Sequence, residues 1–196
     1  MRRARKQATE SGVRCPAMGR ARVIAGLLLV GFAACAQVPG QDVPDVRTPL
    51  VVVNEMLRLA SVSAGDVVYD LGSGDGRIVI AAARGRGARG VGYEIDPALV
   101  AESTERARRL GLADRVSFVQ QDLFEADLRP ATVVTLYLSP DLNRKLRPKL
   151  LSELRPGSRI VSHTFDMGDW VPTRALQVSS NEGSHTLYLW IVPASR

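Results

Sequence analysis

Three glycines and four acidic residues stand where a nucleotide-like ligand could be bound. Gly72, Gly74 and Gly76 alternate with Ser73 and Asp75 in the segment DLGSGDG, which continues a short apolar run. Glycine permits a positive φ and lets a ligand approach the main chain closely. The spacing therefore predicts a continuous bare strip of backbone on which a ligand lies.

The acidic residues near this loop distinguish between the ligands that a glycine-rich loop can hold. Asp70 and Asp75 flank it, and carboxylates beside a pyrophosphate would be unfavourable in a partly dehydrated site. A dinucleotide loop would also need a glycine where Arg77 stands, and a Walker A loop would need Gly-Lys-Ser/Thr. A ligand with a cationic amino acid part and a sulfonium fits instead, and that description matches S-adenosylmethionine.

Two further acids follow the next two apolar runs. Glu94 ends GVGYE, 24 residues after Asp70, where an acid can accept hydrogen bonds from both ribose hydroxyls. Asp122, followed by Leu123, ends VSFVQQD and could accept from an adenine amino group. Successive strand ends thus offer acids to the methionine part, the ribose and the base, and the sequence predicts S-adenosylmethionine as cofactor.

Apolar runs alternate with helical patterns along the chain and predict the elements that position these residues. Asp96 and Pro97 are typical of a helix start, Gly111 of a helix end, and Pro148 predicts a break or kink. The pattern indicates an α/β fold with a doubly wound, mostly parallel seven-stranded sheet and an antiparallel C-terminal strand. The expected strands are 67–71, 90–95, 115–123, 131–138, 156–165, about 175–179 and 185–192, and the helices are 50–62, 77–87, 96–112 and 141–154.

Charge is distributed unevenly between the first residues and the rest of the chain. Of the 26 basic and 20 acidic side chains, residues 1–22 hold seven basic ones and one acid, which leaves 19 of each sign. The net charge of +6 is thus a property of the leader. The neutral remainder gives no electrostatic case for binding nucleic acid, so none is predicted as a partner.

The leader has the pattern of a targeting segment, and we expect a signal peptide or N-terminal membrane anchor over 1–36. Arg20 and Arg22 precede an uncharged apolar run that is shorter than the roughly 20 residues of a spanning helix. Cleavage after Ala36 or lipidation of Cys35 would give a periplasmic or membrane-anchored protein, and translation could also start at Met18. A linker over 37–47 and one domain over 48–196 would follow.

Both cysteines, Cys15 and Cys35, lie in that leader, so the domain has no thiol nucleophile and no cysteine-based metal site. The two histidines stand far apart in the sequence, and we expect no metal. Export conflicts with a cofactor that is made in the cytoplasm, which favours the alternative of a domain that faces the cytoplasm.

The segments DLGSGDGRIVIAAA, GVGYEIDPALV and VSFVQQDLFEAD resemble the first three motifs of class I S-adenosylmethionine-dependent methyltransferases. Together with LRPGSRIVSHTFDMGDWVP, they are similar to the protein-lysine methyltransferases that include the enzyme acting on the c subunit of ATP synthase. The resemblance implies a protein-lysine substrate, and that Thr48 and Pro49, in DVRTPLVVVNEML, close over the cofactor. A small-molecule methyltransferase and a non-catalytic, exported S-adenosylmethionine- or nucleoside-binding module remain alternatives, and we expect a monomer.

Candidates for a catalytic role follow the fourth and fifth predicted strands. Tyr137 could line the acceptor channel, and His163 or Asp166 could take the proton that a lysine ammonium must lose. Phe165 and Trp170 could stack against an alkylammonium group, whereas His185 is expected to be a hydrogen-bonded strand residue. The Asn/Asp-Pro-Pro-aromatic motif of methyltransferases that act on nucleic-acid bases is missing from LYLSPDL, which counts against base methylation.

Overall fold

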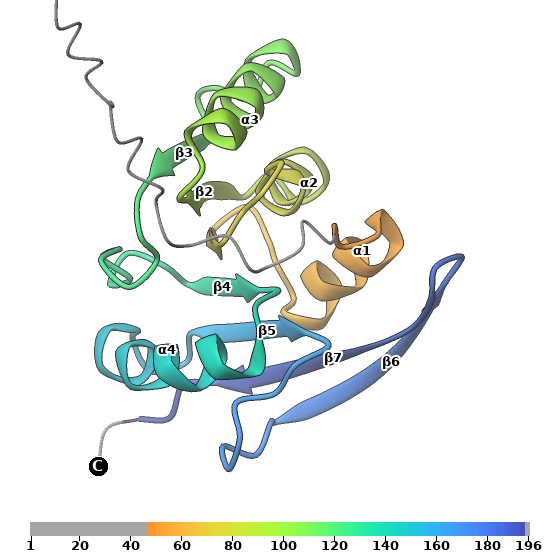
Figure 1. Cartoon of the computed structure of the whole chain (residues 1–196), viewed down its shortest axis with the longest axis vertical. Coiled ribbons are helices and arrows are strands. Elements are labelled where there is room, and N and C mark those ends of the chain that lie inside the picture. Colours follow the sequence, from red (N-terminus) through yellow and green to blue (C-terminus); the bar gives the residue numbers. More distant parts are fainter. Residues whose placement is uncertain (1–46, 195–196) are drawn as a thin grey trace, which may run out of the picture. The chain divides into compact units, whose positions relative to one another are not determined.

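The computed structural model describes residues 47–194, in which helices and strands alternate (Figure 1). Their order and bounds are α1 Leu50–Leu59, β1 Val67–Leu71, α2 Arg77–Arg86, β2 Arg89–Glu94, α3 Pro97–Arg109, β3 Val116–Gln120, β4 Val133–Leu136, α4 Pro140–Glu153, β5 Arg159–His163, β6 Arg174–Ser180 and β7 Gly183–Ile191.

The seven strands form one sheet in the order β3-β2-β1-β4-β5-β7-β6. Strands β1 to β5 pair in parallel, whereas β7 is antiparallel to both β5 and β6. Asp70 of β1 lies opposite Gly92 and Thr135 of its neighbours, and Glu94 lies opposite Gln120. The predicted fold class is confirmed, and the parallel register brings the predicted site residues to one edge of the sheet.

Helices cover both faces of this sheet. Figure 1 shows α1, α2 and α3 on one side and α4 on the other. Val68 and Val133 belong to the apolar cluster under the first three helices, whereas the next residues, Tyr69 and Val134, join Leu150 of α4 in a second cluster. Successive strand residues point to opposite faces, so the near-continuous apolar runs of these strands reflect burial on both faces.

The helix ends agree with the local signals in the sequence. Asp96 accepts a hydrogen bond from the N–H of Ala98 at 2.8 Å, and Pro97 is the first residue of α3. Beyond the last turn of this helix, Gly111 has a φ of +69°. An αL residue just past the helix is where glycine has no Cβ penalty, and the predicted cap at each end is confirmed.

A break or a kink was expected at Pro148, and the break is wrong, because α4 runs continuously from Pro140 to Glu153 with this proline inside it. A proline in a helix interior removes one backbone hydrogen bond and costs about 3 kcal/mol. Leu146 and Leu150 on either side of it are fully buried in the second apolar cluster. Their burial offsets that cost, so tertiary packing overrides the local preference.

The predicted leader over 1–36 and nearly all of the predicted linker over 37–47 lie outside the described residues. Within residues 47–194, no helix combines the length and the apolar character needed to cross a membrane.

Candidate functional site

The glycine loop joins β1 to α2 at the carboxyl edge of the parallel strands. Gly72, Gly74 and Gly76 have φ values of +78°, +51° and +72°. A Cβ at Gly72 would lie 2.9 Å from Leu138 and one at Gly76 would lie 2.4 Å from Phe118, whereas one at Gly74 would meet no atom within 4 Å. Gly72 is exposed and Gly74 is half-buried, whereas Gly76 is buried, so the backbone that a ligand could approach lies at the first two glycines.

Ser73, in the same loop, carries a buried polar atom. Its Oγ makes no hydrogen bond among the described residues, although its N–H donates to the carbonyl of Tyr93 at 2.9 Å. Buried hydroxyls are nearly always hydrogen-bonded. This Oγ lies 2.6 Å from the position that a Cβ would take at Gly92, so glycine in β2 leaves the room for the Ser73 side chain.

Glu94 ends β2 with its carboxylate fixed beside the open space at Gly74. Its Oε2 accepts a hydrogen bond from the N–H of Gly74 at 2.8 Å, and its Oε1 accepts from the N–H groups of Ile95 and Asp96 at 2.8 and 3.1 Å. Each carboxylate oxygen can accept more than one hydrogen bond. The carboxylate is thus held in place and can still accept from a ligand's hydroxyl groups.

Asp70, the last residue but one of β1, is almost fully buried, at 2% exposure. Its Oδ1 accepts a hydrogen bond from Thr135 Oγ1 at 2.6 Å. Burial raises the pKa of Asp70 to about 7, against the effect of the Thr135 bond and with a smaller contribution from the nearby Glu94 and Asp75 carboxylates. A cationic group brought to this carboxyl would favour its ionised form.

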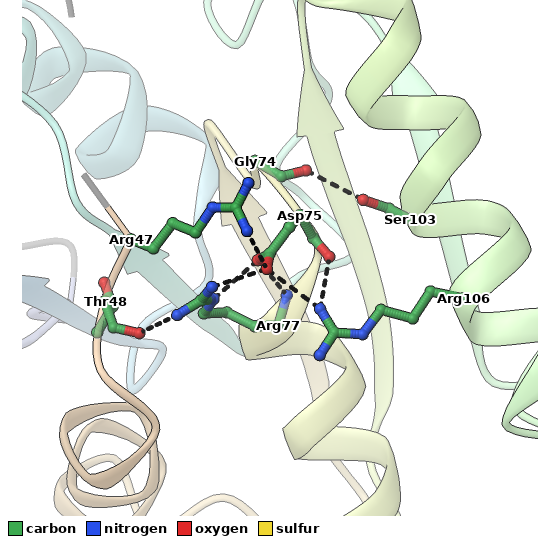
Figure 2. A network of polar contacts seen from close by, with 7 residues as sticks. All are labelled: Arg47, Thr48, Gly74, Asp75, Arg77, Ser103 and Arg106. Atoms are coloured by element: carbon green, nitrogen blue, oxygen red, sulfur yellow. Dashed lines mark hydrogen bonds and ion pairs between the residues drawn. The ribbon is translucent and has the colours of Figure 1, made fainter. Parts of the chain in front are cut away.

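Asp75 lies among three arginine side chains (Figure 2). It accepts hydrogen bonds from Arg77 Nε and Nη2 at 2.8 Å and from Arg106 Nη1 at 3.1 Å, and Arg47 Nη1 lies 3.8 Å from its Oδ2. Burial would raise the pKa of Asp75, but the arginines outweigh it and lower the pKa. Its charge is balanced inside the protein, so the repulsion of phosphate that the sequence suggested for Asp75 does not follow from its surroundings.

The same arginine cluster ties the entry segment, which we define as residues 47–49, to the glycine loop. Arg77 Nη1 donates to the carbonyl of Thr48 at 2.8 Å. On the other side of the loop, Ser103 Oγ of α3 donates to the carbonyl of Gly74 at 3.0 Å (Figure 2). The loop is therefore anchored from α3 and from the entry segment at once.

Asp122 and Leu123 follow β3, beside the strand that carries Glu94. The N–H of Gln121 donates to the carbonyl of Glu94 at 3.0 Å, which places this turn next to the end of β2. Asp122 is exposed, and its Oδ1 accepts the N–H of Phe124 at 2.9 Å. Leu123 is half-buried against the apolar cluster under α4.

His163 ends β5 and is fully buried where three segments meet. Its Nδ1 hydrogen-bonds with Thr48 Oγ1 at 3.2 Å, and its Nε2 hydrogen-bonds with His185 Nδ1 of β7 at 2.9 Å. The ring of Tyr137, just after β4, lies 4.0 Å from the His163 ring between centroids. Burial, with a smaller effect of His185, lowers the pKa of His163 to about 4, so its imidazole is neutral near pH 7.

The two aromatic residues suggested as a lysine-binding pair lie in different surroundings. Phe165 stacks with Tyr137, with 6.4 Å between ring centroids. Trp170 instead lies 5.9 Å from Trp190 and has the Arg147 guanidinium 5.8 Å above its ring. Tyr137 and Phe165 therefore form the aromatic surface beside His163, and Trp170 packs under α4.

The segment after β5 is held by a residue that sequence reasoning missed. Asn143 of α4 is fully buried, and its Nδ2 donates to Ser162 Oγ at 3.1 Å and to the carbonyls of Phe165 and Asp166 at 3.1 and 3.2 Å. The Asp166 carboxylate is exposed and accepts the N–H of Gly168 at 3.0 Å, which closes a turn. An amide among the leucines of an amphipathic helix was the signal that could have identified Asn143.

Comparison with known proteins places this geometry in a family. The model of the ANTKMT methyltransferase domain matches residues 70–174, from the end of β1 to the start of β6. A protein-lysine N-methyltransferase of Saccharolobus islandicus (strain REY15A) is 43% identical over 151 residues, which is 76% of this chain and 94% of that protein. A Xenopus laevis lysine N-methyltransferase named for the c subunit of ATP synthase is 36% identical over 154 residues. The match covers 79% of this chain and 64% of the Xenopus protein.

A solved structure shares both the sequence and the fold. It is a crystal structure described as an RNA methyltransferase from Salinibacter ruber in complex with S-adenosyl-L-homocysteine. It is 57% identical with a TM-score of 0.72, and the match covers 77% of this chain and 96% of that chain. The matched residues 70–174 include Asp70, Glu94, Tyr137 and His163. Together with these relatives the match confirms the resemblance to class I methyltransferases, and the chain belongs to the ANTKMT methyltransferase domain family.

Proposed function

We propose that this protein transfers a methyl group from S-adenosylmethionine to the ε-amino group of a lysine in a protein. The observation that carries this proposal is the 43% identity with a protein-lysine N-methyltransferase over nearly all of that relative. The carboxyl edge of the sheet supports it, because one open backbone position, Gly74, lies beside a fixed carboxylate, Glu94.

Chain residues at this edge suit each part of the cofactor. Glu94 would accept from the ribose hydroxyls, Asp122 from the adenine amino group, and the buried carboxyl of Asp70 would face the cationic methionine part. Ile95, directly after Glu94, is 61% exposed although it is apolar, and it would pack against the adenine ring. Its exposure, which the sequence did not reveal, is explained if a ligand covers it.

The acceptor would enter between the entry segment and the ends of β4 and β5. When bound, S-adenosylmethionine supplies an electrophilic methyl group on a sulfonium. The protein aligns the acceptor, excludes water and removes the proton, because only the neutral amine is a nucleophile. Tyr137 and Phe165 offer ring surfaces to the lysine stem, and Thr48 with His163 lies beside them. Asp166, which is exposed and committed to a turn, is less suited to accept this proton.

RNA is the second candidate acceptor, because a relative at 57% identity is described as an RNA methyltransferase. Against it, residues 47–194 carry 18 basic and 17 acidic side chains. Proteins that bind nucleic acid usually carry a strong excess of basic residues on the binding domain. A lysine-containing protein is therefore the acceptor that we favour.

The test is incubation of the full chain with S-adenosylmethionine labelled in its methyl group and a bacterial cell extract. We expect label in material that protease destroys and ribonuclease leaves intact, and methyl-lysine after acid hydrolysis. Label that ribonuclease removes would assign the activity to RNA, and label in the small-molecule fraction would assign it to a small acceptor. Binding of S-adenosylhomocysteine without any transfer would indicate the non-catalytic module.

A matched pair of variants ties the label to the proposed site. Glu94→Ala removes the carboxylate that would hold the ribose, and we expect it to abolish transfer. Glu102→Ala changes an exposed carboxylate on α3 and should leave transfer unchanged. Equal labelling by both variants would show that the Glu94 carboxylate does not hold the cofactor.

We also propose that residues 1–36 anchor the chain to a membrane, and that the domain is a monomer that meets its cofactor on the cytoplasmic side. The basic residues and the apolar run of the leader support membrane association. Cell fractionation with N-terminal sequencing tests this. An intact leader in the membrane fraction supports the proposal, whereas a chain beginning at Gln37 in the periplasm contradicts it. Light scattering of the purified protein tests the monomer.

A further inference from the structure

A row of hydrogen bonds leads from the buried end of β5 to the turn between β6 and β7. Thr48 Oγ1 bonds with His163 Nδ1 at 3.2 Å, His163 Nε2 with His185 Nδ1 at 2.9 Å, and His185 Nε2 with Ser180 Oγ at 2.8 Å. We propose that Thr48, His163, His185 and Ser180 form a proton relay that carries the proton of the acceptor ammonium from the catalytic edge to solvent. The proposal rests on the methyl transfer proposed above and assigns roles to His185 and Ser180.

The geometry allows a continuous relay because each imidazole uses both of its nitrogens within the row. A neutral imidazole has one N–H donor and one acceptor nitrogen. If Thr48 donates to His163, then His163 donates to His185 and His185 donates to Ser180, and the reverse order is equally consistent. The tautomer of one ring therefore fixes that of the other.

A proton crosses this row without any change in its composition. Thr48 Oγ1 takes a proton from the ammonium and gives its own to His163 Nδ1. The proton on His163 Nε2 moves to His185 Nδ1, and the proton on His185 Nε2 moves to Ser180 Oγ, which releases its original proton to water. One ammonium proton is lost to solvent, and both rings end neutral in the other tautomer. Before the next turnover each imidazole must lose the proton on Nδ1 and gain one on Nε2, and the two hydroxyls must turn back to their first directions.

The surroundings of His163 favour passing a proton on over keeping it. The ring is fully buried, and its neighbours are the Thr48 hydroxyl, the Tyr137 ring and the ring of His185. Burial disfavours an imidazolium there, which agrees with the lowered pKa. The neutral His163 ring has Thr48 on one side and His185 on the other, so it can accept a proton from one of them only while it gives its own proton to the other.

The backbone after His163 is strained in a way that holds this link. Thr164 has a φ of +69°, rare for a residue other than glycine, and the N–H of Phe165 donates to the carbonyl of His163 at 2.8 Å. This is the geometry of a γ-turn of the less common hand. At the surface end, the N–H of Glu182 donates to Ser180 Oγ at 3.0 Å and fixes the hydroxyl in the hairpin turn.

The first experiment reads the relay without any catalysis. Side-chain ¹⁵N spectra of both histidines are recorded for the full-length wild type, for Ser180→Ala and for the control Ser184→Ala, whose hydroxyl donates to Gln177 on the same hairpin. We expect Ser180→Ala to shift the tautomer signals of both His185 and His163, and Ser184→Ala to shift neither. A change confined to His185 would overturn the relay.

The second experiment measures methyl transfer into the cell extract described above. We expect His185→Ala to lower kcat about tenfold or more, with the Kd for S-adenosylhomocysteine within about twofold of wild type, and free imidazole to restore part of the rate. An unchanged kcat, or a loss that imidazole does not restore, would overturn the relay. A wild type that transfers no methyl group would contradict the proposed function, and the coupling of the two histidines would then be decided by the spectra alone.

Discussion

Gly74 and Gly76 stand two residues apart in one loop, yet a methyl group would act differently at each. At Gly74 the methyl group would point into open space, whereas at Gly76 it would lie 2.4 Å from the ring of Phe118. We expect Gly74→Ala to cost about 1–2 kcal/mol of stability, because φ is +51° there, and to weaken S-adenosylhomocysteine binding at least tenfold.

Gly76→Ala serves as the comparison for this prediction. The same positive φ and the clash with Phe118 together should lower the free energy of unfolding by more than about 2 kcal/mol. Urea unfolding and titration calorimetry on both variants separate the two effects. Full cofactor affinity in Gly74→Ala would show that no ligand lies against this part of the loop.

Asp70 should make cofactor affinity depend on pH. Its pKa of about 7 means that the carboxyl is largely protonated below pH 7, and the cationic amino group of the cofactor requires the carboxylate. Affinity should therefore fall with falling pH, by about tenfold between pH 8 and pH 6. Calorimetry at the two values checks this.

Two variants control for other titrating groups in that measurement. Asp70→Asn should bind more weakly and show no such dependence, whereas Asp114→Asn, at an exposed carboxylate, should keep it. A pH dependence that persists in Asp70→Asn would assign it to another group.

At the scale of the elements, α4 controls the segment that follows β5. Asn143→Ala removes the hydrogen bonds to Ser162, Phe165 and Asp166, and we expect a loss of about 1–3 kcal/mol in stability. Exchange of the backbone amide hydrogens should become faster in residues 163–166, the turn that begins with His163. Asn181→Ala, in the exposed turn between β6 and β7, should change neither. Unaltered exchange in Asn143→Ala would show that the turn holds itself.

The elements could be predicted from the sequence because their signals are local. The cap at Asp96, the closing Gly111 and the apolar strands buried on both faces follow from residues adjacent in the chain. Pro148 could not be read in this way, because what keeps α4 intact is burial of Leu146 and Leu150 against distant strands.

The site was predictable to the same extent and no further. Acids at successive strand ends could be found by position, and they do lie at one edge of the sheet. The arginines around Asp75 could not, because Arg106 comes from another helix, 31 residues along the chain. The histidine pair was missed for a similar reason, since only the antiparallel β7 brings His185 beside His163.

For the molecule as a whole, two buried groups should oppose each other in the pH dependence of stability. The raised pKa of Asp70 means that the native state holds this proton longer than the unfolded state, so this group's contribution to stability increases as pH falls from about 7 to 4. The lowered pKa of His163 has the opposite effect. Between pH 6.5 and about 4 this histidine is protonated in the unfolded chain and neutral in the native state, so its contribution to stability decreases as pH falls.

Single variants should reveal each contribution. Between pH 7 and pH 5, Asp70→Asn should lose about 2 kcal/mol of stability and His163→Gln should gain about 2 kcal/mol, whereas the wild type changes little. Urea unfolding at the two pH values measures this. Parallel profiles in the three proteins would contradict the assignment to these two groups.

The place of β7 in the sheet has a consequence for how the protein is made. This strand lies between β5 and β6, although it follows both in the chain. During synthesis, the backbone groups of β5 that pair with β7 therefore stay unpaired, and β6 has no partner strand, until β7 leaves the ribosome. Open strand edges invite pairing with other chains. His185 belongs to the same strand. Before β7 pairs, the nascent chain therefore has open strand edges that favour aggregation and also lacks part of its catalytic edge. Pairing of β7 with β5 and β6 closes those edges and completes the site.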